Sequence, residues 1–206
     1  MDRKPHWENI YEKKADQDVS WFEPLPAMSL RMLDAAGMTP DSCIVDVGGG
    51  SSQLIDRLLE RGVRCLTVLD VSGAALRRTQ ARLGQAAASV NWIESDVTAD
   101  WSIEPVDIWH DRAVFHFLNS VVDRERYRVQ LLRVLKIHGT AIVATFATDG
   151  PETCSGLPVM RFSAESLAFE LGPRFRLVES VRHEHRTPRG VVQPFTYARF
   201  RRQEAP

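Results

Sequence analysis

The sequence predicts an α/β fold in which a parallel sheet is covered by helices. Apolar runs typical of buried strands alternate with segments of helical periodicity between residues 40 and 146, and this alternation indicates a parallel sheet. The chain has 206 residues, of which 44% are hydrophobic, and this size suits one domain with a full core. We therefore expect a single domain over residues 1–206, built around such a sheet.

Cap and turn residues justify the elements of the first half. Pro26 and Gly37 stand where a helix favours proline near its start and glycine after its end. Ser72 has the side chain of a helix cap. The expected elements are a helix over 26–36, a strand over 43–47, a helix over 53–61, a strand over 65–69 and a helix over 72–83.

In the second half, the pattern changes after residue 146. Strands are expected over 90–93, 106–109 and 140–146, with a helix that Asp123 caps and that runs to Leu135. Glycines and prolines predict a loop over 148–160, and Ser163 predicts a short helix that ends at Gly172. Two long strands over 175–186 and 192–202 are joined by a turn at 187–190. Such a hairpin implies an antiparallel strand in the sheet.

A glycine loop follows the first strand, and acidic residues follow the first four. Gly48, Gly49 and Gly50 come directly after the strand over 43–47, and a helix begins behind them. Glycines let a ligand approach the backbone closely, and a helix start offers free N–H groups. The dinucleotide fingerprint G-x-G-x-x-G requires glycine where this chain has Gln53. A nucleotide site of another kind is therefore predicted.

The four acidic residues are Asp46, Asp70, Asp96 and Asp111. Ligands of open α/β sheets bind at the carboxyl ends of the strands, so we expect these carboxylates to converge beside the glycine loop. Asp70 can accept hydrogen bonds from two ribose hydroxyls. Taken one at a time, each acid is better explained as a turn or cap residue. Their repetition after successive strands favours a binding site.

Composition excludes several classes of partner. The net charge of −1 and the pI near 6.6 argue against a broad nucleic-acid surface. No signal peptide or membrane-spanning run is visible, so no membrane partner and a cytoplasmic location are expected. Three scattered cysteines suggest a reducing compartment without a disulfide framework. A monomer or weak dimer is expected, and no metal site.

The motif D-x-G-x-G, from Asp46 to Gly50, and the series of acids resemble class I S-adenosylmethionine (SAM) dependent methyltransferases. The resemblance is strongest over residues 40–146. It implies a Rossmann-like, doubly wound, seven-stranded sheet with strand order 3-2-1-4-5-7-6, in which strand seven is antiparallel. It divides the chain into an N-terminal helical lid over 1–37, a SAM-binding core over 40–146 and an acceptor-side region over 147–206.

The resemblance also implies roles for individual residues. The glycine loop would border the methionine part of SAM, Asp70 the ribose, and Asp96 the adenine amine. Asp111 and Arg112 would lie near the reacting methyl group, which makes Asp111 and His116 catalytic candidates. The full set of cofactor-binding candidates is Trp21, Asp46, Gly48, Gly49, Gly50, Ser51, Asp70, Val71, Ser72, Asp96, Val97, Asp111, Arg112 and Ala113.

The N-terminal segment that contains His6-Trp7-Glu8-Asn9-Ile10-Tyr11 and Ser20-Trp21-Phe22, which we call the leader, resembles that of small methyltransferases, including the citrate synthase and elongation-factor lysine methyltransferases. Trp7, Tyr11 and Trp21 are either a lid over SAM or packing aromatics. His183 and His185 share one face of a strand, which is interpreted as exposed and charged rather than as a metal site with Cys154.

The expected function is transfer of a methyl group from SAM to a small molecule, with S-adenosylhomocysteine (SAH) as the second product. Two alternatives stay open, a protein lysine N-methyltransferase and a non-catalytic SAM-binding module. The sequence does not identify the acceptor or its reacting atom, because loops of unknown shape build the acceptor pocket.

Overall fold

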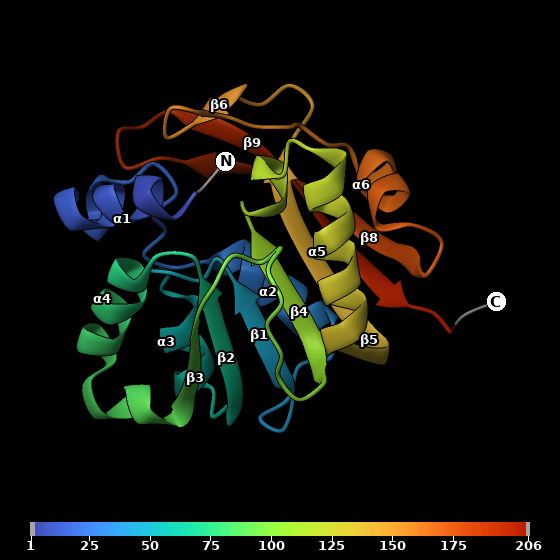
Figure 1. The fold of residues 1–206 in the computed structure, drawn as a ribbon, viewed down its shortest axis with the longest axis horizontal. Coiled ribbons are helices and arrows are strands. Elements are labelled where there is room, and N and C mark those ends of the chain that lie inside the picture. The colour runs from blue at the N-terminus through green and yellow to red at the C-terminus, as the bar shows by residue number, and fades with distance from the viewer. Residues whose placement is uncertain (1–2, 205–206) are drawn as a thin grey trace.

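The computed structural model describes residues 3–204 and has one seven-stranded sheet with helices on both faces (Figure 1). The strand order is β3-β2-β1-β4-β5-β9-β8. All pairs are parallel except β5–β9 and β8–β9. This is the predicted order 3-2-1-4-5-7-6, because two short strands, β6 and β7, precede the last two. The Rossmann-like fold predicted from the sequence is confirmed.

The strands are β1 Cys43–Val47, β2 Cys65–Asp70, β3 Val90–Glu94, β4 Val106–Arg112, β5 Leu135–Phe146, β6 Thr153–Cys154, β7 Leu157–Pro158, β8 Phe175–Arg186 and β9 Val192–Arg202. The α-helices are α1 Lys4–Lys13, α2 Ala27–Ala35, α3 Leu54–Glu60, α4 Gly73–Leu83, α5 Val121–Val134 and α6 Ala164–Leu171. Three 3-10 segments complete them: η1 Asp16–Asp18, η2 Gly84–Ser89 and η3 Phe115–Phe117.

The core has two layers, one on each face of the sheet. Leu33 of α2, Leu58 of α3 and Leu76 of α4 pack on one face. Leu131 of α5 and Leu167 of α6 pack on the other. Because successive residues of a strand point to opposite faces, neighbours in β1 join different layers. This alternation also decides which way each polar side chain at the strand ends points.

Local signals fixed most element boundaries. Ser72 accepts the N–H of Ala75 and caps α4 as predicted. The predicted cap of α5 at Asp123 was wrong: Ser120 is the cap, and its hydroxyl accepts the Asp123 N–H. Strand β4 also runs to Arg112, so Asp111 lies inside the strand and not after it.

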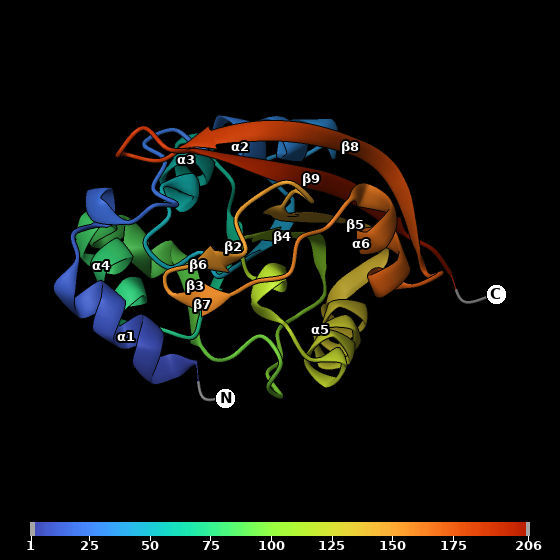
Figure 2. The same cartoon turned by 90° about the horizontal axis from the view of Figure 1, so that it is seen from above.

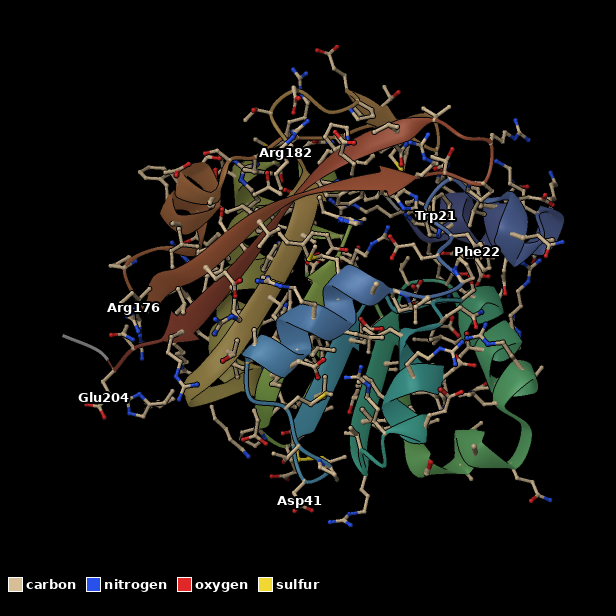
Figure 3. All side chains as sticks on the ribbon, turned by 180° about the vertical axis from the view of Figure 1, so that it is seen from behind. Trp21, Phe22, Asp41, Arg176, Arg182 and Glu204 are labelled. Carbon is tan, nitrogen blue, oxygen red and sulfur yellow. A yellow bond between two sulfur atoms is a disulfide. The ribbon has the colours of Figure 1, made fainter. Side chains whose placement is uncertain are left out.

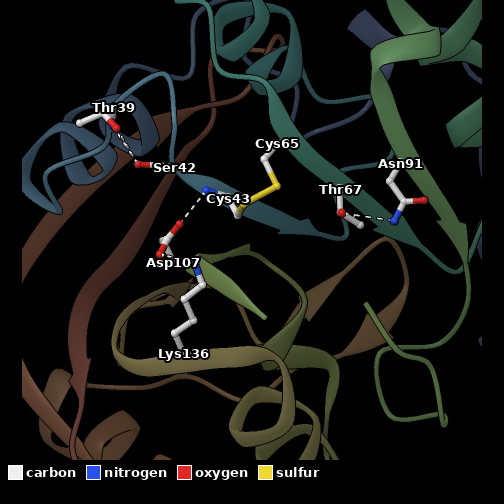
Figure 4. Close-up of a disulfide and its surroundings, with 8 residues drawn as sticks. All are labelled: Thr39, Ser42, Cys43, Cys65, Thr67, Asn91, Asp107 and Lys136. Carbon is white, nitrogen blue, oxygen red and sulfur yellow. Dashed lines mark hydrogen bonds and ion pairs between the residues drawn. A yellow bond between two sulfur atoms is a disulfide. The ribbon is translucent and has the colours of Figure 1, made fainter. Parts of the chain in front are cut away.

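Cys43 and Cys65 form a disulfide between β1 and β2, which corrects the expectation of unpaired cysteines (Figure 4). Each is the first residue of its strand, and the register pairs them directly with a Cα–Cα distance of 4.5 Å. Spacing along the sequence could not reveal this, because the pairing depends on the strand register. The disulfide lies at the opposite end of β1 from the glycine loop.

Segments before α2 and after β5 meet over the carboxyl edge of the sheet. Viewed from above, α1 and the β6–β7 hairpin lie over the strand ends (Figure 2). Ion pairs and hydrogen bonds from α1 reach β3 and the start of α4. In residues 3–204, no helix is long and apolar enough to cross a membrane.

Candidate functional site

The glycine loop after β1 is packed against two of the predicted carboxylates. A Cβ on Gly49 would lie 2.6 Å from Asp46 Oδ2, and one on Gly50 would lie 2.7 Å from Asp70 Oδ2. Gly48 and Gly50 also have positive φ, of 66° and 32°. Such close approach leaves no room for a side chain. The loop and the carboxylates of β1 and β2 therefore form one unit.

Asp70 is buried at the end of β2. Its Oδ1 accepts the Ser72 N–H at 2.8 Å. Burial raises the pKa of Asp70 to about 7, and the nearby charges of Asp46 and Glu8 act in the same direction. Glu8 of α1 accepts hydrogen bonds from the Ser72 hydroxyl and from the Gly73 and Ala74 N–H groups. The carboxylate at this helix start thus comes from the N-terminal leader.

Asp96 lies in the turn after β3 and has two sets of partners. Its Oδ1 accepts hydrogen bonds from the Thr98 N–H and hydroxyl at 2.8 and 2.7 Å. Its Oδ2 is 3.2 Å from Arg3 Nη1. Burial would raise the pKa of Asp96, but the bonds from Thr98 and the charge of Arg3 outweigh it and lower the pKa. This carboxylate is therefore ionised and still half-exposed.

Asp46 and His110 form a buried pair between β1 and β4. His110 Nδ1 is 2.7 Å from Asp46 Oδ1, and its Nε2 is 3.0 Å from the Ser29 hydroxyl of α2. Both histidine nitrogens thus have partners within the protein. The pair orients the Asp46 carboxylate below Gly49.

Asp111 points away from the cavities, contrary to the expectation that it lies near the reacting methyl group. It is 0% exposed and lies on the α5 face, because it alternates with Arg112 along β4. It accepts the Tyr127 hydroxyl at 2.8 Å and the Val114 N–H at 2.9 Å. Burial raises the pKa of Asp111 to about 6. Asp111 holds the turn after β4 in place.

His116 likewise lies outside the cavities and has no access to an acceptor. It is 0% exposed, and its Nδ1 accepts the Phe146 N–H at 3.3 Å. Burial, together with the charge of Arg112, lowers the pKa of His116 to about 3. The structure thus gives no support to the predicted catalytic role, because a buried, weakly basic imidazole cannot receive a proton from a molecule in the cavity.

Arg112 lies at the boundary between two cavities. Its Nε donates to the Tyr197 hydroxyl at 3.0 Å, and its Nη1 donates to the Trp21 carbonyl at 3.1 Å. Its Nη2 is 3.0 Å from Glu23 Oε1. The guanidinium therefore joins β4, β9 and the leader.

The first cavity encloses about 730 Å³, part of which is open to solvent. Its floor includes Gly48, Asp70 and Asp96, and its opposite wall includes Trp7 and Trp21 of the leader. The second cavity lies between the glycine loop and residues 19–29. Of the predicted cofactor residues, those that line one or both cavities are Trp21, Asp46, Gly48, Gly49, Ser51, Asp70, Val71, Asp96, Val97, Arg112 and Ala113.

Gly50, Ser72 and Asp111 of the same set line neither cavity; Gly50 and Ser72 support Asp70 instead. Residues missed from the sequence also line the cavities: Arg3, Glu23, Phe117 and Leu118. Glu23 directly follows the Ser20-Trp21-Phe22 motif, which was a usable signal. Among residues 3–204, no group of three or more histidine, cysteine or acidic side chains is placed to hold a metal ion.

A family model described as a methyltransferase domain matches residues 44–139, which span the glycine loop, Asp70, Asp96 and β4. The motif and the strand order agree with it. The family model, together with the fold, supports a class I SAM-dependent methyltransferase. The cofactor of this class is SAM, as the sequence predicted. No curated protein sequence matches the chain.

Solved methyltransferase structures share the fold. A SAM-dependent methyltransferase from Anabaena variabilis has a TM-score of 0.79 at 17% identity, covering 97% of this chain and 95% of that one. The N-methyltransferase NodS from Bradyrhizobium japonicum, solved with SAH, has a TM-score of 0.74 at 18% identity, covering 96% and 98%. The 1,6-didemethyltoxoflavin-N1-methyltransferase from Burkholderia thailandensis has a TM-score of 0.70 at 17% identity, covering 98% and 84%.

The side chains of this methyltransferase fit SAM. Asp70 and Asp96 offer carboxylates at the carboxyl edge of β2 and β3, as their predicted hydrogen bonds to the ribose and the adenine amine require. Glu23 Oε2 is buried without a hydrogen-bond partner and belongs to a residue lining the second cavity. An unsatisfied buried acceptor favours a ligand with N–H groups, such as the amino group of the methionine part of SAM. The individual roles stay predictions.

Proposed function

We propose that the chain transfers a methyl group from SAM to a small-molecule acceptor. The observation that supports this most is the first cavity, which is partly open to solvent and mainly apolar. The leader covers the strand ends from one side and Cys154 of β6 lines the same cavity from the other. Concave, mainly apolar pockets are typical of small-ligand sites. A protein substrate needs a groove open enough for a backbone to approach the reacting centre.

Three aromatic side chains form much of the apolar wall of the proposed acceptor space. Trp7 is edge-on to both Trp21 and Phe117, with ring centroids 5.6 and 5.0 Å apart. All three line the first cavity. Rings in this arrangement give flat apolar surface with little freedom. We expect an acceptor with a planar or apolar body.

The chemistry asks little of the protein besides alignment. SAM supplies an electrophilic methyl group on a sulfonium. In the transfer, a lone pair of the acceptor forms the new bond to the methyl carbon, and the carbon–sulfur electron pair returns to sulfur. Holding the two partners in line contributes up to about 7–11 kcal/mol to the lowering of the barrier. The protein therefore needs mainly to align SAM with the acceptor and to exclude water from the reacting atoms.

The described residues of the first cavity include no histidine, and its two carboxylates, Asp70 and Asp96, are the proposed partners of the ribose and the adenine amine rather than of the acceptor. Burial raises the pKa of the Cys154 thiol to about 11, so this group is not a base near neutral pH. We therefore expect the acceptor's nucleophilic atom to arrive without its proton, as a ring nitrogen, thiolate or acidic hydroxyl does.

Two structural neighbours are consistent with this proposal. One carries 1,6-didemethyltoxoflavin and SAH, and another converts a disulfide bond into a thioacetal group during echinomycin biosynthesis. At 17% identity, these structures show a shared fold and not a shared substrate. The proposal of a small-molecule acceptor therefore rests on the cavity.

The test is a transfer assay with methyl-tritiated SAM on extract separated into small molecules and macromolecules. Label in the small-molecule fraction supports the proposal. Label confined to protein would replace it with the lysine methyltransferase alternative. Tight SAH binding without any transfer would support a SAM-binding module. The control is Gly50→Ala, which displaces the Asp70 carboxylate and should give no label in either fraction.

A further inference from the structure

Residues 20–23, which we call the strap, are the last part of the leader before α2. They form part of the walls of both cavities. Trp21 lines both cavities, while Phe22 and Glu23 line the second. Figure 3 shows Trp21 and Phe22 beside the tip of the β8–β9 hairpin. The residues that hold the strap are therefore on distant strands and not beside it in the sequence.

His185 of β8 bridges the two ends of the strap. Its Nδ1 is 3.0 Å from Glu23 Oε1, and its Nε2 is 2.6 Å from the Ser20 carbonyl oxygen. The side chain is 2% exposed, which corrects the expectation that this face of β8 is solvated. Arg112 adds a second tie, to the Trp21 carbonyl and Glu23.

Both nitrogens of His185 therefore face oxygen atoms that accept hydrogen bonds. The Ser20 carbonyl can only accept. Burial would raise the pKa of Glu23, but the bond from His185 and the charges of Arg112 and His185 outweigh it and lower the pKa, so this carboxylate also only accepts. A neutral imidazole has one N–H, and an imidazolium has two. Both bonds form together only when the ring carries both protons.

We propose that His185 is a positioning residue, whose protonated ring clamps the strap over the SAM cavity and thereby strengthens cofactor binding. The role rests on the proposed function, since it presumes that SAM occupies the cavity. His185 touches neither cavity and acts through Glu23 and Trp21. Loss of one proton from the ring removes one of the two bonds and thereby weakens the clamp.

Other groups around the clamp bear on the same equilibrium. Phe195 of β9 packs edge-on against the ring at 6.1 Å between centroids. The charged or titratable groups that interact with His185 or Glu23 are Glu23 itself on the strap, Arg112 on β4, His183 on β8 and Tyr197 on β9. Of the two histidines of β8, His185 has the hydrogen bonds to the strap.

The experiment compares SAH dissociation constants of the full chain by calorimetry from about pH 6 to about pH 8.5. Asp70 and SAH also titrate, but equally in all proteins, so the ratio of variant to wild type isolates His185. For His185→Gln, we expect a ratio of about ten at the lowest pH, falling to about one at the highest. The control His183→Gln should give a ratio near one throughout.

A ratio of one at every pH would overturn the proposal, and so would a ratio that does not change with pH, because a purely structural role weakens binding without a pH trend. If His185→Gln does not fold, His185→Asn tests the same clamp, because it also removes the ring that contacts Ser20 and Glu23. We expect the same falling ratio, which a flat ratio would contradict.

Hydrogen exchange in the ligand-free protein separates this proposal from the proposed function. We expect amides of residues 20–23 to exchange at least about tenfold faster in His185→Gln than in wild type at about pH 6, and unchanged in His183→Gln. Equal exchange in all three proteins would overturn the clamp. If wild type does not bind SAH, the proposed function fails, and exchange still decides the clamp.

Discussion

The two sides of the first cavity are built in different ways. One carries Asp70 and Asp96 and is called the adenosine side after its predicted ligand, and the other is the leader side. On the adenosine side, each carboxylate is held by the backbone two residues further on: Asp70 by the Ser72 N–H and Asp96 by the Thr98 N–H. On the leader side, Glu8 binds the Gly73 N–H and Glu23 binds His185, at separations of 65 and 162 residues. Short-range turns therefore fix the first side, and tertiary contacts fix the second.

This difference predicts unequal tolerance to change. A substitution on the adenosine side disturbs groups that the local chain holds rigidly, so its effect on SAH affinity is large. A substitution on the leader side loosens a wall that several other contacts still support. Substitutions remote from both sides should leave SAH affinity unchanged.

The largest effect is expected for Gly50→Ala. The new Cβ would lie 2.7 Å from Asp70 Oδ2, on a backbone with φ of 32°. We expect SAH affinity, measured by calorimetry, to fall by at least about 100-fold. Gly62→Ala is the matched control, since Gly62 also has positive φ but no atom within 4 Å of its Cβ position. An equal loss of SAH affinity in both variants would show that the glycine loop has no special role in binding.

Trp21→Ala should have an intermediate effect. The ring lines both cavities, but Trp7 and Tyr11 also contact it and stay in place. We expect SAH affinity to fall about tenfold in the same titration. The exposed Phe169→Ala, on α6, serves as the control. A loss as large as that of Gly50→Ala would mean that the two sides contribute equally.

Replacing Asp70 by Asn should weaken SAH binding and also reduce the loss of folding stability as the pH rises. Its pKa is raised from 3.8 to about 7 in the folded state, so the folded protein binds more protons than the unfolded chain. Stability from this group is therefore lost as the pH rises through about 4 to 7. Between pH 5 and pH 8, the unfolding free energy of the ligand-free wild type should fall by about 2 kcal/mol more than that of Asp70→Asn.

Urea unfolding of wild type and Asp70→Asn at both pH values measures this difference. The raised pKa predicts that the Asn variant gains stability relative to wild type at the higher pH. If wild type gained stability relative to the variant as the pH rose, Asp70 would be stabilised in its charged form. The assigned environment would then be wrong.

The smallest effect on binding is expected for Cys43→Ser. The disulfide with Cys65 closes a loop of 22 residues at the far end of β1 from the cavity. Its loss should lower the free energy of unfolding by about 2–4 kcal/mol. SAH affinity at 25 °C should not change, and a tenfold loss would show that the two ends of β1 are coupled.

The sequence predicted the parts of the site that local chemistry determines. Alternating apolar runs predicted the parallel sheet, and the resemblance to class I methyltransferases implied its strand order. The D-x-G-x-G motif with Asp70 and Asp96 located the cavity floor. The prediction for Asp111 was wrong because strand β4 runs three residues further than the apolar run 106–109 indicated. That extension sets which face of the sheet Asp111 occupies.

Tertiary placement was beyond the reach of the sequence. His116 and Asp111 resembled catalytic residues only because they follow a strand end, whereas their burial depends on packing under α5 and β5. His185 lies in an alternating charged strand, and nothing nearby in the chain shows that residues 20 and 23 cover it. Contacts over such separations depend on the whole fold.

The most direct test of the account is calorimetric titration of SAH into wild type and Asp70→Asn. If the carboxyl edge of β1 and β2 holds the cofactor, wild type binds one SAH per chain, and the variant, which keeps its acceptor for the Ser72 N–H, binds at least about tenfold more weakly. Absence of binding to wild type, or equal affinity of the two proteins, would contradict it.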